Sequence, residues 1–375
     1  MLPGTMNITK LLAGMKKLGA SDLHIKVGYP PTFRVNGLLR PVQTDPMTAD
    51  EAEHFLDGIV PEKIKGRFEA TGDLDFAAFV DGDRFRVNMF RAGGGVNAAI
   101  RRVKAEIPTF ESLGLPKVYK DLSDTTGEGL VLVVGVTGSG KSTTLAAMIE
   151  HINATRAEHI ITVEDPVEYR FVPQKSIVSQ REIGIDVTDY KAALRYVVRQ
   201  DPDVVFIGEL RDHDTVLAAI QAAETGHLVF GSMHTADTSQ SFSRILEFFP
   251  TSEHTFLRSA LASSLRAICA QRLLPGVGEM NEGKGGMVPA TEVLLNSPIV
   301  QQKIRQGEDE DFPAIINASR SEGMRSFTYS LSELVKQDRV SLRVAMEYAP
   351  NREALDAMIK GVEVRAQTLV GKLRG

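Results

Sequence analysis

The sequence predicts an α/β fold: a largely parallel sheet with helices on both faces, preceded by a smaller α+β domain. From residue 130 onward, short apolar runs alternate with helical patterns, which is typical of such a sheet. The first of these runs leads into a glycine-rich loop and a helix, whereas the region before residue 115 groups strands joined by tight turns. A chain of 375 residues is long enough for two domains, and we place them at residues 1–115 and 116–375.

Composition narrows the class of protein. The chain is 43% hydrophobic and 24% charged, with a net charge of -5, so it is an ordinary globular protein without the strongly basic surface that favours nucleic acid. Cys269 is the single cysteine, which excludes an internal disulfide and a four-cysteine zinc site and fits a reducing cytoplasm. No apolar run reaches the roughly 18 residues of a membrane span. We expect no structural metal.

The N-terminal elements follow from periodicity and turn residues. Apolar residues at helical spacing predict a helix that ends at Gly19, and Thr48 with Glu51 forms a capping box for a second helix. Pro61 opens a third helix, and Asn36-Gly37 predicts a tight hairpin turn. The predicted helices are 8–18, 48–59 and 61–70, and the predicted strands are 21–27, 32–35, 38–42, 74–80, 84–91 and 96–103.

The C-terminal elements alternate. Strands are expected at residues 130–134, 160–163, 177–179, 204–207 and 228–233, with helices ending near residues 154, 199 and 224. After Pro250 we predict a helical tail, interrupted by a flexible glycine-rich loop at residues 275–286 and by a strand at 288–294.

The loop after the first apolar strand carries the clearest chemistry. Its glycines allow the backbone N–H groups to point at an anion, and the following helix adds its positive end. Lys141 would reach the outer phosphates and Ser142 would offer a hydroxyl to Mg²⁺. A glycine-rich turn with an accidental Lys-Ser is the alternative, but a strand precedes this loop and a helix follows it. The pattern predicts an ATP or GTP site formed by Gly135, Thr137, Gly138, Ser139, Gly140, Lys141, Ser142 and Thr143.

Carboxylates follow two of the predicted strands. Glu209 comes after the strand at 204–207, in the manner of a Walker B acid although a Gly–Glu replaces the usual Asp. Glu164, Asp165 and Glu168 come after the strand at 160–163. Acids of a surface loop are the alternative for each group, but ligands of open α/β sheets bind at the carboxyl ends of the strands.

Histidines and arginines complete the candidates. His234 lies just past the strand at 228–233, where a neutral imidazole could contact a γ-phosphate or hold a carboxylate, whereas His227 fits a structural role equally well. Five arginines fall on the N-terminal strands, where they form either a solvated sheet face or arginine fingers that reach a nucleotide. They are Arg84, Arg86, Arg91, Arg101 and Arg102.

Together these motifs identify a resemblance. The chain resembles the secretion-type ATPases of type IV pili, in particular the PilT/PilU family of retraction ATPases. The segments that carry the resemblance are 19–24, 84–88, 135–144, 164–168, 180–182, 199–203, 208–212 and 223–227, with His234-Thr235.

The resemblance implies a PAS-like N-terminal domain, a RecA-like ATPase domain and assembly into a homo-hexamer. It implies Glu168 as the general base, Glu209 as the Walker B acid that binds Mg²⁺ with Ser142, and His234 as a γ-phosphate contact. Arg86 and Arg101 become the arginine fingers, and ATP rather than GTP becomes the nucleotide. The implied partners are an inner-membrane pilus platform protein, a paralogous retraction ATPase and, indirectly, the pilin fibre, with the motor at the cytoplasmic face of the inner membrane.

Two alternatives to a retraction motor stay open, and so does the choice between two kinds of retraction motor. A nucleic-acid motor on a RecA-like core is disfavoured by the acidic pI of about 6.0, and we expect no nucleic-acid partner. A nucleotide-dependent scaffold that hardly hydrolyses ATP would carry similar motifs. The lack of a four-cysteine module argues for retraction over pilus assembly, and residues 298–308 resemble PilU more than PilT, so the main and accessory retraction motors both fit.

Overall fold

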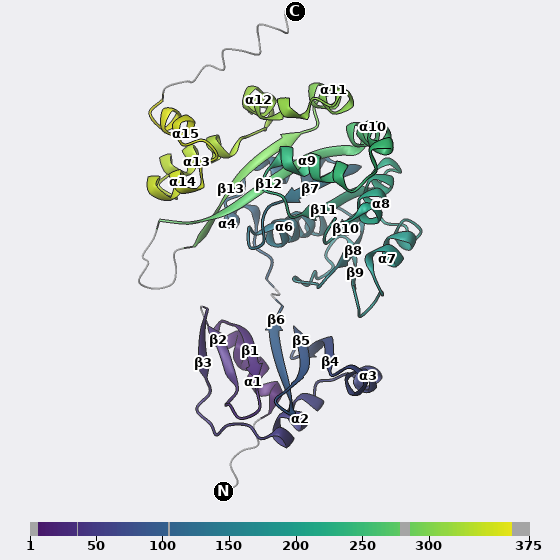
Figure 1. The fold of residues 1–375 in the computed structure, drawn as a ribbon, viewed down its shortest axis with the longest axis vertical. Coiled ribbons are helices and arrows are strands. Elements are labelled where there is room, and N and C mark those ends of the chain that lie inside the picture. Colours follow the sequence, from purple (N-terminus) through teal and green to yellow (C-terminus); the bar gives the residue numbers. More distant parts are fainter. Residues whose placement is uncertain (1–6, 36, 104–105, 278–285, 362–375) are drawn as a thin grey trace, which may run out of the picture. The chain divides into compact units, whose positions relative to one another are not determined.

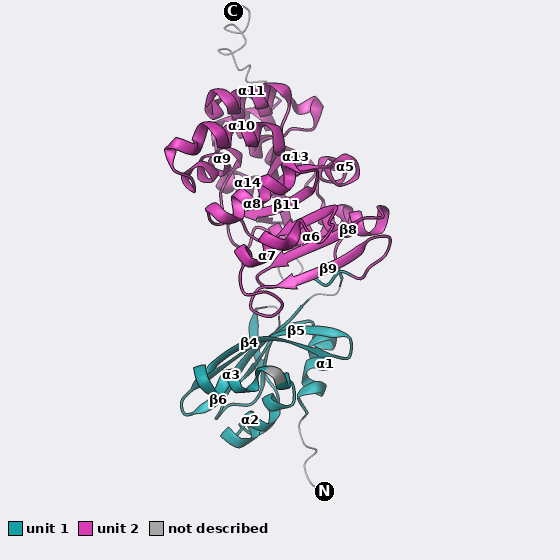
Figure 2. Cartoon of the chain, turned by 90° about the vertical axis from the view of Figure 1, so that its right-hand side faces the viewer, with its two compact units in different colours: residues 1–106, 167–171 teal, residues 107–166, 172–375 magenta. Residues whose placement is uncertain are grey.

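The computed structural model describes residues 7–35, 37–103, 106–277 and 286–361. The chain divides into two compact units (Figure 2). The first contains the residues up to Glu106 together with the short segment Val167–Phe171, and the second contains Ile107–Pro166 and the residues from Val172 onward.

The first unit is built on a six-stranded antiparallel sheet (Figure 1). Along the fifth strand, Phe85, Val87 and Met89 are buried, whereas the alternate Arg84, Arg86 and Asn88 are not. One face of the sheet therefore packs on the core and the other carries charge. In spatial order the strands are β3 (Leu38–Pro41), β2 (Thr32–Val35), β1 (Ala20–Ile25), β6 (Gly95–Arg102), β5 (Asp83–Ala92) and β4 (Asp73–Val80).

Helices of the first unit begin and end at the residues that local chemistry favours. Helix α1 (Ile8–Leu18) ends at Gly19, whose φ of 62° suits a residue without a side chain. Helix α2 (Ala49–Asp57) has the predicted capping box of Thr48 and Glu51, because each side chain bonds the backbone N–H of the other. Pro61 opens a 3₁₀ turn (Glu62–Ile64) before helix α3 (Lys65–Thr71), rather than one continuous helix. The predicted turn residue Asn36 lies outside the described residues.

The second unit contains a seven-stranded sheet that is parallel except at one edge. In spatial order its strands are β13 (Met287–Leu295), β12 (Leu265–Pro275), β7 (Gly129–Val134), β11 (Leu228–Met233), β10 (Val204–Ile207), β8 (His159–Glu164) and β9 (Ile177–Glu182). The antiparallel edge pair is β12 with β13. The predicted α/β class is confirmed.

One part of the sequence prediction is wrong. Residues 265–275 are not helical but form strand β12, which pairs in parallel with β7 inside the sheet. The segment follows helix α10 (His254–Ser264) without a glycine or proline between them, and its apolar run fits a buried helix as well as a strand. Pairing with β7 decides between the two. The predicted strand at 288–294 is confirmed as β13, whereas most of the predicted loop at 275–286 lies outside the described residues.

Helices cover both faces of this sheet. All of β7 is buried, and its residues Leu130, Leu132 and Val134 share a core cluster with helices α8 and α10. The alternate residues Val131 and Val133 are equally buried and point to the opposite face. The helices are α4 (Phe110–Leu113), α5 (Lys117–Thr125), α6 (Lys141–Thr155), α7 (Tyr190–Val197), α8 (His213–Glu224), α9 (Thr238–Glu247), α10, α11 (Pro298–Gln306), α12 (Phe312–Ala318), α13 (Phe327–Lys336), α14 (Leu342–Tyr348) and α15 (Arg352–Ile359).

Among the described residues, none of the helices combines the length and the apolar character needed to span a bilayer.

Candidate functional site

The phosphate loop lies between β7 and α6, as predicted, and its glycines are sterically required. A Cβ atom added to Gly135 would lie 2.3 Å from the Ser139 hydroxyl oxygen and 2.5 Å from the Gln271 carbonyl oxygen. Gly140 has a φ of 90°, and a Cβ there would lie 2.7 Å from the side-chain nitrogen of Gln271. Larger residues at either position would therefore deform the loop.

Lys141 is folded onto this loop. Its side chain is nearly buried, and its ammonium group donates to the carbonyl oxygens of Gly135 at 2.8 Å and Val136 at 3.3 Å. Ser142 and Thr143 follow it in the first turn of α6. A buried cation and the N-terminus of a helix thus meet at the curled backbone, which is the arrangement that binds phosphate.

The side chain of Gln271 is a component of the site that sequence reasoning missed. Gln271 lies on β12 and is buried. Its amide nitrogen donates to the Ser139 carbonyl at 2.7 Å, and its amide oxygen accepts from the Thr144 hydroxyl at 2.8 Å. It therefore joins the loop to the first turns of α6. The one available signal was an amide within an apolar run.

Replacing Gln271 with alanine should loosen the phosphate loop, because the Ser139 carbonyl and the Thr144 hydroxyl would lose their partner in the interior. We expect a loss of about 1–3 kcal/mol in the free energy of unfolding and a roughly tenfold weaker affinity for a fluorescent ADP analogue. Gln337→Ala is the matched control, since Gln337 is exposed at the end of α13. Equal nucleotide affinity in the two variants would contradict this role.

Three predicted residues of the second unit meet at the carboxyl ends of the strands. The Thr137 hydroxyl oxygen lies 3.3 Å from Nδ1 of His234, and Nε2 of His234 lies 3.7 Å from a carboxylate oxygen of Glu209. If Nδ1 accepts from the Thr137 hydroxyl, the ring proton sits on Nε2 and faces Glu209. The phosphate loop, the end of β11 and the end of β10 are thereby linked. The side chains of His234 and Glu209 are 44% and 37% exposed, so a ligand can reach them.

The acids that follow β8 differ in burial and in their partners. Glu164 is buried, and its carboxylate accepts from the hydroxyl of Thr162 at 2.6 Å and from the amide of Gln180 at 3.2 Å. It therefore helps to hold β8 and β9 together. Asp165 is exposed. Glu168, four residues after Glu164 in the chain, is also exposed and belongs to the segment grouped with the first unit.

The two predicted arginine fingers lie side by side in the first unit, because Arg86 on β5 is paired with Arg101 on β6. Nε of Arg101 donates to the Asp22 carboxylate at 2.8 Å, and Arg86 lies 3.9 Å from Asp75. Arg101 nevertheless keeps a side chain that is 71% exposed.

Asp22 is a second component for which no role was predicted. It is nearly buried and lies opposite Arg101 in the pairing of β1 with β6. Burial acts to raise the pKa of this carboxyl, but hydrogen bonds from Arg101 and Ser21 outweigh it and hold the pKa below its usual value. Asp22 is therefore a fixed anion that orients Arg101.

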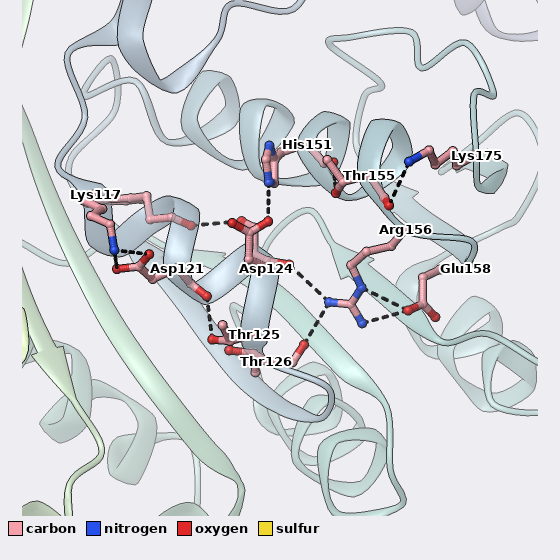
Figure 3. Close-up of polar contacts among 12 residues, drawn as sticks. Lys117, Asp121, Asp124, Thr125, Thr126, His151, Thr155, Arg156, Glu158 and Lys175 are labelled. Carbon is pink, nitrogen blue, oxygen red and sulfur yellow. Dashed lines mark hydrogen bonds and ion pairs between the residues drawn. The ribbon is translucent and has the colours of Figure 1, made fainter.

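Helix α6 is fastened at its far end to α5 (Figure 3). His151 Nε2 lies 2.5 Å from the Asp124 carboxylate. One guanidinium nitrogen of Arg156 donates to the carbonyls of Ser123 at 3.1 Å and Thr126 at 3.0 Å, which satisfies the C-terminus of α5. The helix that begins at the phosphate loop is thus tied to the segment that precedes β7.

Known proteins resemble this chain over most of its length. The family described as "Type II/IV secretion system protein" matches residues 5–306. The type IV pilus retraction ATPase PilT of Pseudomonas aeruginosa is 39% identical over 345 residues, covering 92% of this chain and 98% of that protein. The type IV pilus ATPase PilU of the same organism is 38% identical over 372 residues, covering 99% of this chain and 96% of that protein.

A solved structure of a related protein has the same fold as this chain. The crystal structure of the pilus retraction motor PilT with bound ADP superimposes with a TM-score of 0.86 and 39% identity, covering 94% of this chain and all of that one. A RecA-like core with a smaller N-terminal domain is the fold expected from the sequence. With a family match over residues 5–306 and relatives above 30% identity, the chain belongs to the type II/IV secretion system protein family.

Proposed function

We propose that this protein is an ATP-hydrolysing motor that powers type IV pilus retraction, and thereby twitching motility. The linked Thr137, His234 and Glu209 beside a phosphate loop carry the proposal, because this geometry is suited to triphosphate hydrolysis. Similarity to the retraction ATPase over 92% of the chain supports the biological role.

The described residues fit ATP and Mg²⁺. The glycine-lined cradle, which a Cβ atom would fill, suits a phosphate chain, with Gly135, Thr137, Gly138, Ser139, Gly140, Lys141, Ser142 and Thr143 as its binding residues. Ser142 and Glu209 offer the oxygen ligands that Mg²⁺ prefers. A Mg²⁺ ion held by Ser142 and Glu209 would neutralise part of the charge on the phosphates.

Each catalytic candidate takes one role in this proposal. Lys141 binds the outer phosphates from its place at the loop, and His234 contacts the γ-phosphate while its ring stays near Glu209. Glu168 accepts the proton of the attacking water as general base. Arg101, oriented by Asp22, and its neighbour Arg86 stabilise the charge of the transition state.

The wider assembly is part of the proposal. We place the domain boundary between residues 115 and 116 and the protein at the cytoplasmic face of the inner membrane. Six copies form a closed ring through a heterologous interface. The ring acts on an inner-membrane platform protein, which removes pilin subunits from the fibre. An accessory role beside a paralogous retraction ATPase is the second candidate, because the identity with PilU extends over 99% of the chain.

Two measurements test this function. The purified full chain should release phosphate from ATP in the presence of Mg²⁺, and should lose that activity in EDTA. Deleting the gene from its host should reduce twitching, and a plasmid copy should restore it. Pili that retract normally after deletion of this gene and its paralogue would overturn the role in retraction. Turnover that appears only after mixing with the paralogue would identify the accessory motor.

A further inference from the structure

Residues 234–237 connect the end of β11 to the start of helix α9, and the first of them is His234. We call these residues the His234 segment. The side chain of His234 is 44% exposed, so packing around the imidazole does not fix its position. The place of the ring beside Thr137 and Glu209 therefore depends on how the rest of the His234 segment is held.

Hydrogen bonds fold the His234 segment onto the first turn of α9. The Ser241 hydroxyl donates to the Asp237 carbonyl at 2.6 Å and lies 2.5 Å from the Thr235 hydroxyl. Because a serine hydroxyl has one proton, Thr235 is the donor in the second of these bonds. Both hydroxyl-bearing residues are buried. The His234 segment and the start of α9 are thus joined by contacts that are shielded from water.

Glu292, on β13, fastens this first turn of α9 to the sheet. Its carboxylate oxygen Oε1 accepts from the backbone N–H of Thr238 at 3.1 Å and from the Thr238 hydroxyl at 2.9 Å. That N–H belongs to the first turn of the helix, where backbone donors lack partners within the helix and a negative charge is favourable. Thr238 is 1% exposed, so the contact lies in the interior.

Glu292 itself is held by its neighbours on β13. The N–H of Thr291 donates to the Ser330 hydroxyl at 3.0 Å. The N–H of Val293 donates to the Arg325 carbonyl at 2.8 Å. Burial raises the pKa of Glu292 above its ordinary value, although its hydrogen bonds act in the opposite direction, so the charged carboxylate costs free energy in this place. Packing of β13 alone would not call for an acid here.

We propose that Glu292 is a positioning residue for recognition of the γ-phosphate, because it fixes the first turn of α9 and thereby the His234 segment. This inference rests on the proposed function for the identity of the ligand. Glu292 acts through His234, so its loss should weaken binding of a nucleoside triphosphate. Binding of a diphosphate, which lacks the γ-phosphate, should be spared.

The test compares two fluorescent nucleotides, an ADP analogue and a non-hydrolysable ATP analogue, on the full chain with Mg²⁺. For Glu292→Ala we expect the affinity for the ATP analogue to fall roughly tenfold, the change expected for losing one hydrogen bond to a charged group. The affinity for the ADP analogue should match wild type. Equal losses for the two nucleotides would overturn the inference, because they would indicate a general loosening of the site.

A double-mutant cycle shows whether Glu292 acts through His234. His234→Ala alone should also weaken binding of the ATP analogue roughly tenfold, since the same phosphate contact is lost. Adding Glu292→Ala to this variant should then change little, because coupled residues are not additive. A double variant that binds roughly a hundredfold more weakly than wild type would show independent effects and would contradict the inference.

Glu158→Ala is the matched control. Glu158 is likewise half-buried, and its carboxylate accepts two hydrogen bonds from Arg156, at 3.0 and 2.8 Å. This variant should lower the thermal unfolding midpoint without changing the preference for the ATP analogue. If Glu292→Ala does not fold, Thr238→Val decides the question, since it removes only the hydroxyl donor and keeps the volume. It should give a smaller loss in the same direction, and an unchanged preference would contradict the role of Glu292.

Failure of the inference can be told from failure of the proposed function. If Glu292→Ala binds the ATP analogue as tightly as wild type, the inference is overturned, and phosphate release by the wild-type protein still decides the motor. If the wild-type protein prefers the ATP analogue but never releases phosphate from ATP, the proposed function is overturned, and the binding cycle still decides the role of Glu292. Wild-type protein that binds both analogues equally would overturn the inference directly, since it would have no γ-phosphate contact to position.

Discussion

Replacement of Lys141 with alanine is expected to lower ATP hydrolysis by roughly 10³-fold, because the variant lacks the one cation that the phosphate loop itself supplies. Lys141 is nearly buried and its ammonium group already bonds the carbonyls of Gly135 and Val136, so its position is fixed before a nucleotide arrives. Binding of the nucleotide therefore costs little entropy for ordering the Lys141 side chain. Phosphate release at saturating Mg²⁺ and ATP measures the effect, and fluorescence of an ADP analogue should show weaker binding as well.

Lys175→Ala provides the control for Lys141→Ala. Lys175 is exposed, and its ammonium group donates to the Thr155 carbonyl at 3.4 Å (Figure 3). Thr155 is the last residue of α6, at the opposite end of that helix from the phosphate loop. This variant should hydrolyse ATP at the wild-type rate. A Lys141→Ala protein that keeps more than about a tenth of wild-type turnover would contradict a role in phosphate binding.

Glu168→Gln should also abolish most turnover, by roughly 10²–10⁴-fold, but for a different reason. The amide has nearly the shape of the carboxylate and cannot accept the proton of the attacking water. Since Glu168 is exposed, the change should leave the folded state intact. Nucleotide affinity should therefore stay within about twofold of wild type, which separates this variant from Lys141→Ala.

The comparison for Glu168→Gln is Glu224→Gln, at the exposed C-terminal end of α8. Single-turnover and steady-state phosphate release would be measured side by side. If Glu168→Gln hydrolyses ATP as fast as Glu224→Gln, the general base must be sought elsewhere on this chain. Glu164 is a poor substitute, because its carboxylate is buried and bonded to Thr162 and Gln180.

The sequence predicted correctly those helix ends that are set by residues close together in the chain. The helix end at Gly19 and the capping box at Thr48 and Glu51 depend on residues within a few positions of each other, and both are confirmed. Strand β12 has no such signal, because nothing in residues 265–275 distinguishes a buried strand from a buried helix. The paired residues of strand β7 lie about 135 positions earlier in the chain, and they supply the hydrogen bonds that make residues 265–275 a strand.

In the candidate site, too, the parts formed by neighbouring residues were predicted and the parts formed by distant residues were not. The phosphate loop was predicted because its residues are contiguous and glycine-rich. The contact between Gln271 and Ser139 joins residues 132 positions apart, and the ion pair of Asp22 with Arg101 depends on the register of two strands 79 positions apart. Single-sequence patterns carry no register information of this kind. The fold class was therefore accessible from the sequence, but the residues that brace the site were not.

The place of Gln271 in the chain also bears on how the protein is made. The ribosome delivers Ser139 and Thr144 long before the amide that bonds both of them. A nascent chain that has not yet passed β12 carries the phosphate loop without the side chain of Gln271, and its sheet still lacks one of the two strands that flank β7. Completion of the nucleotide cradle thus waits for the last third of translation, and a protein shortened before residue 265 would never acquire it.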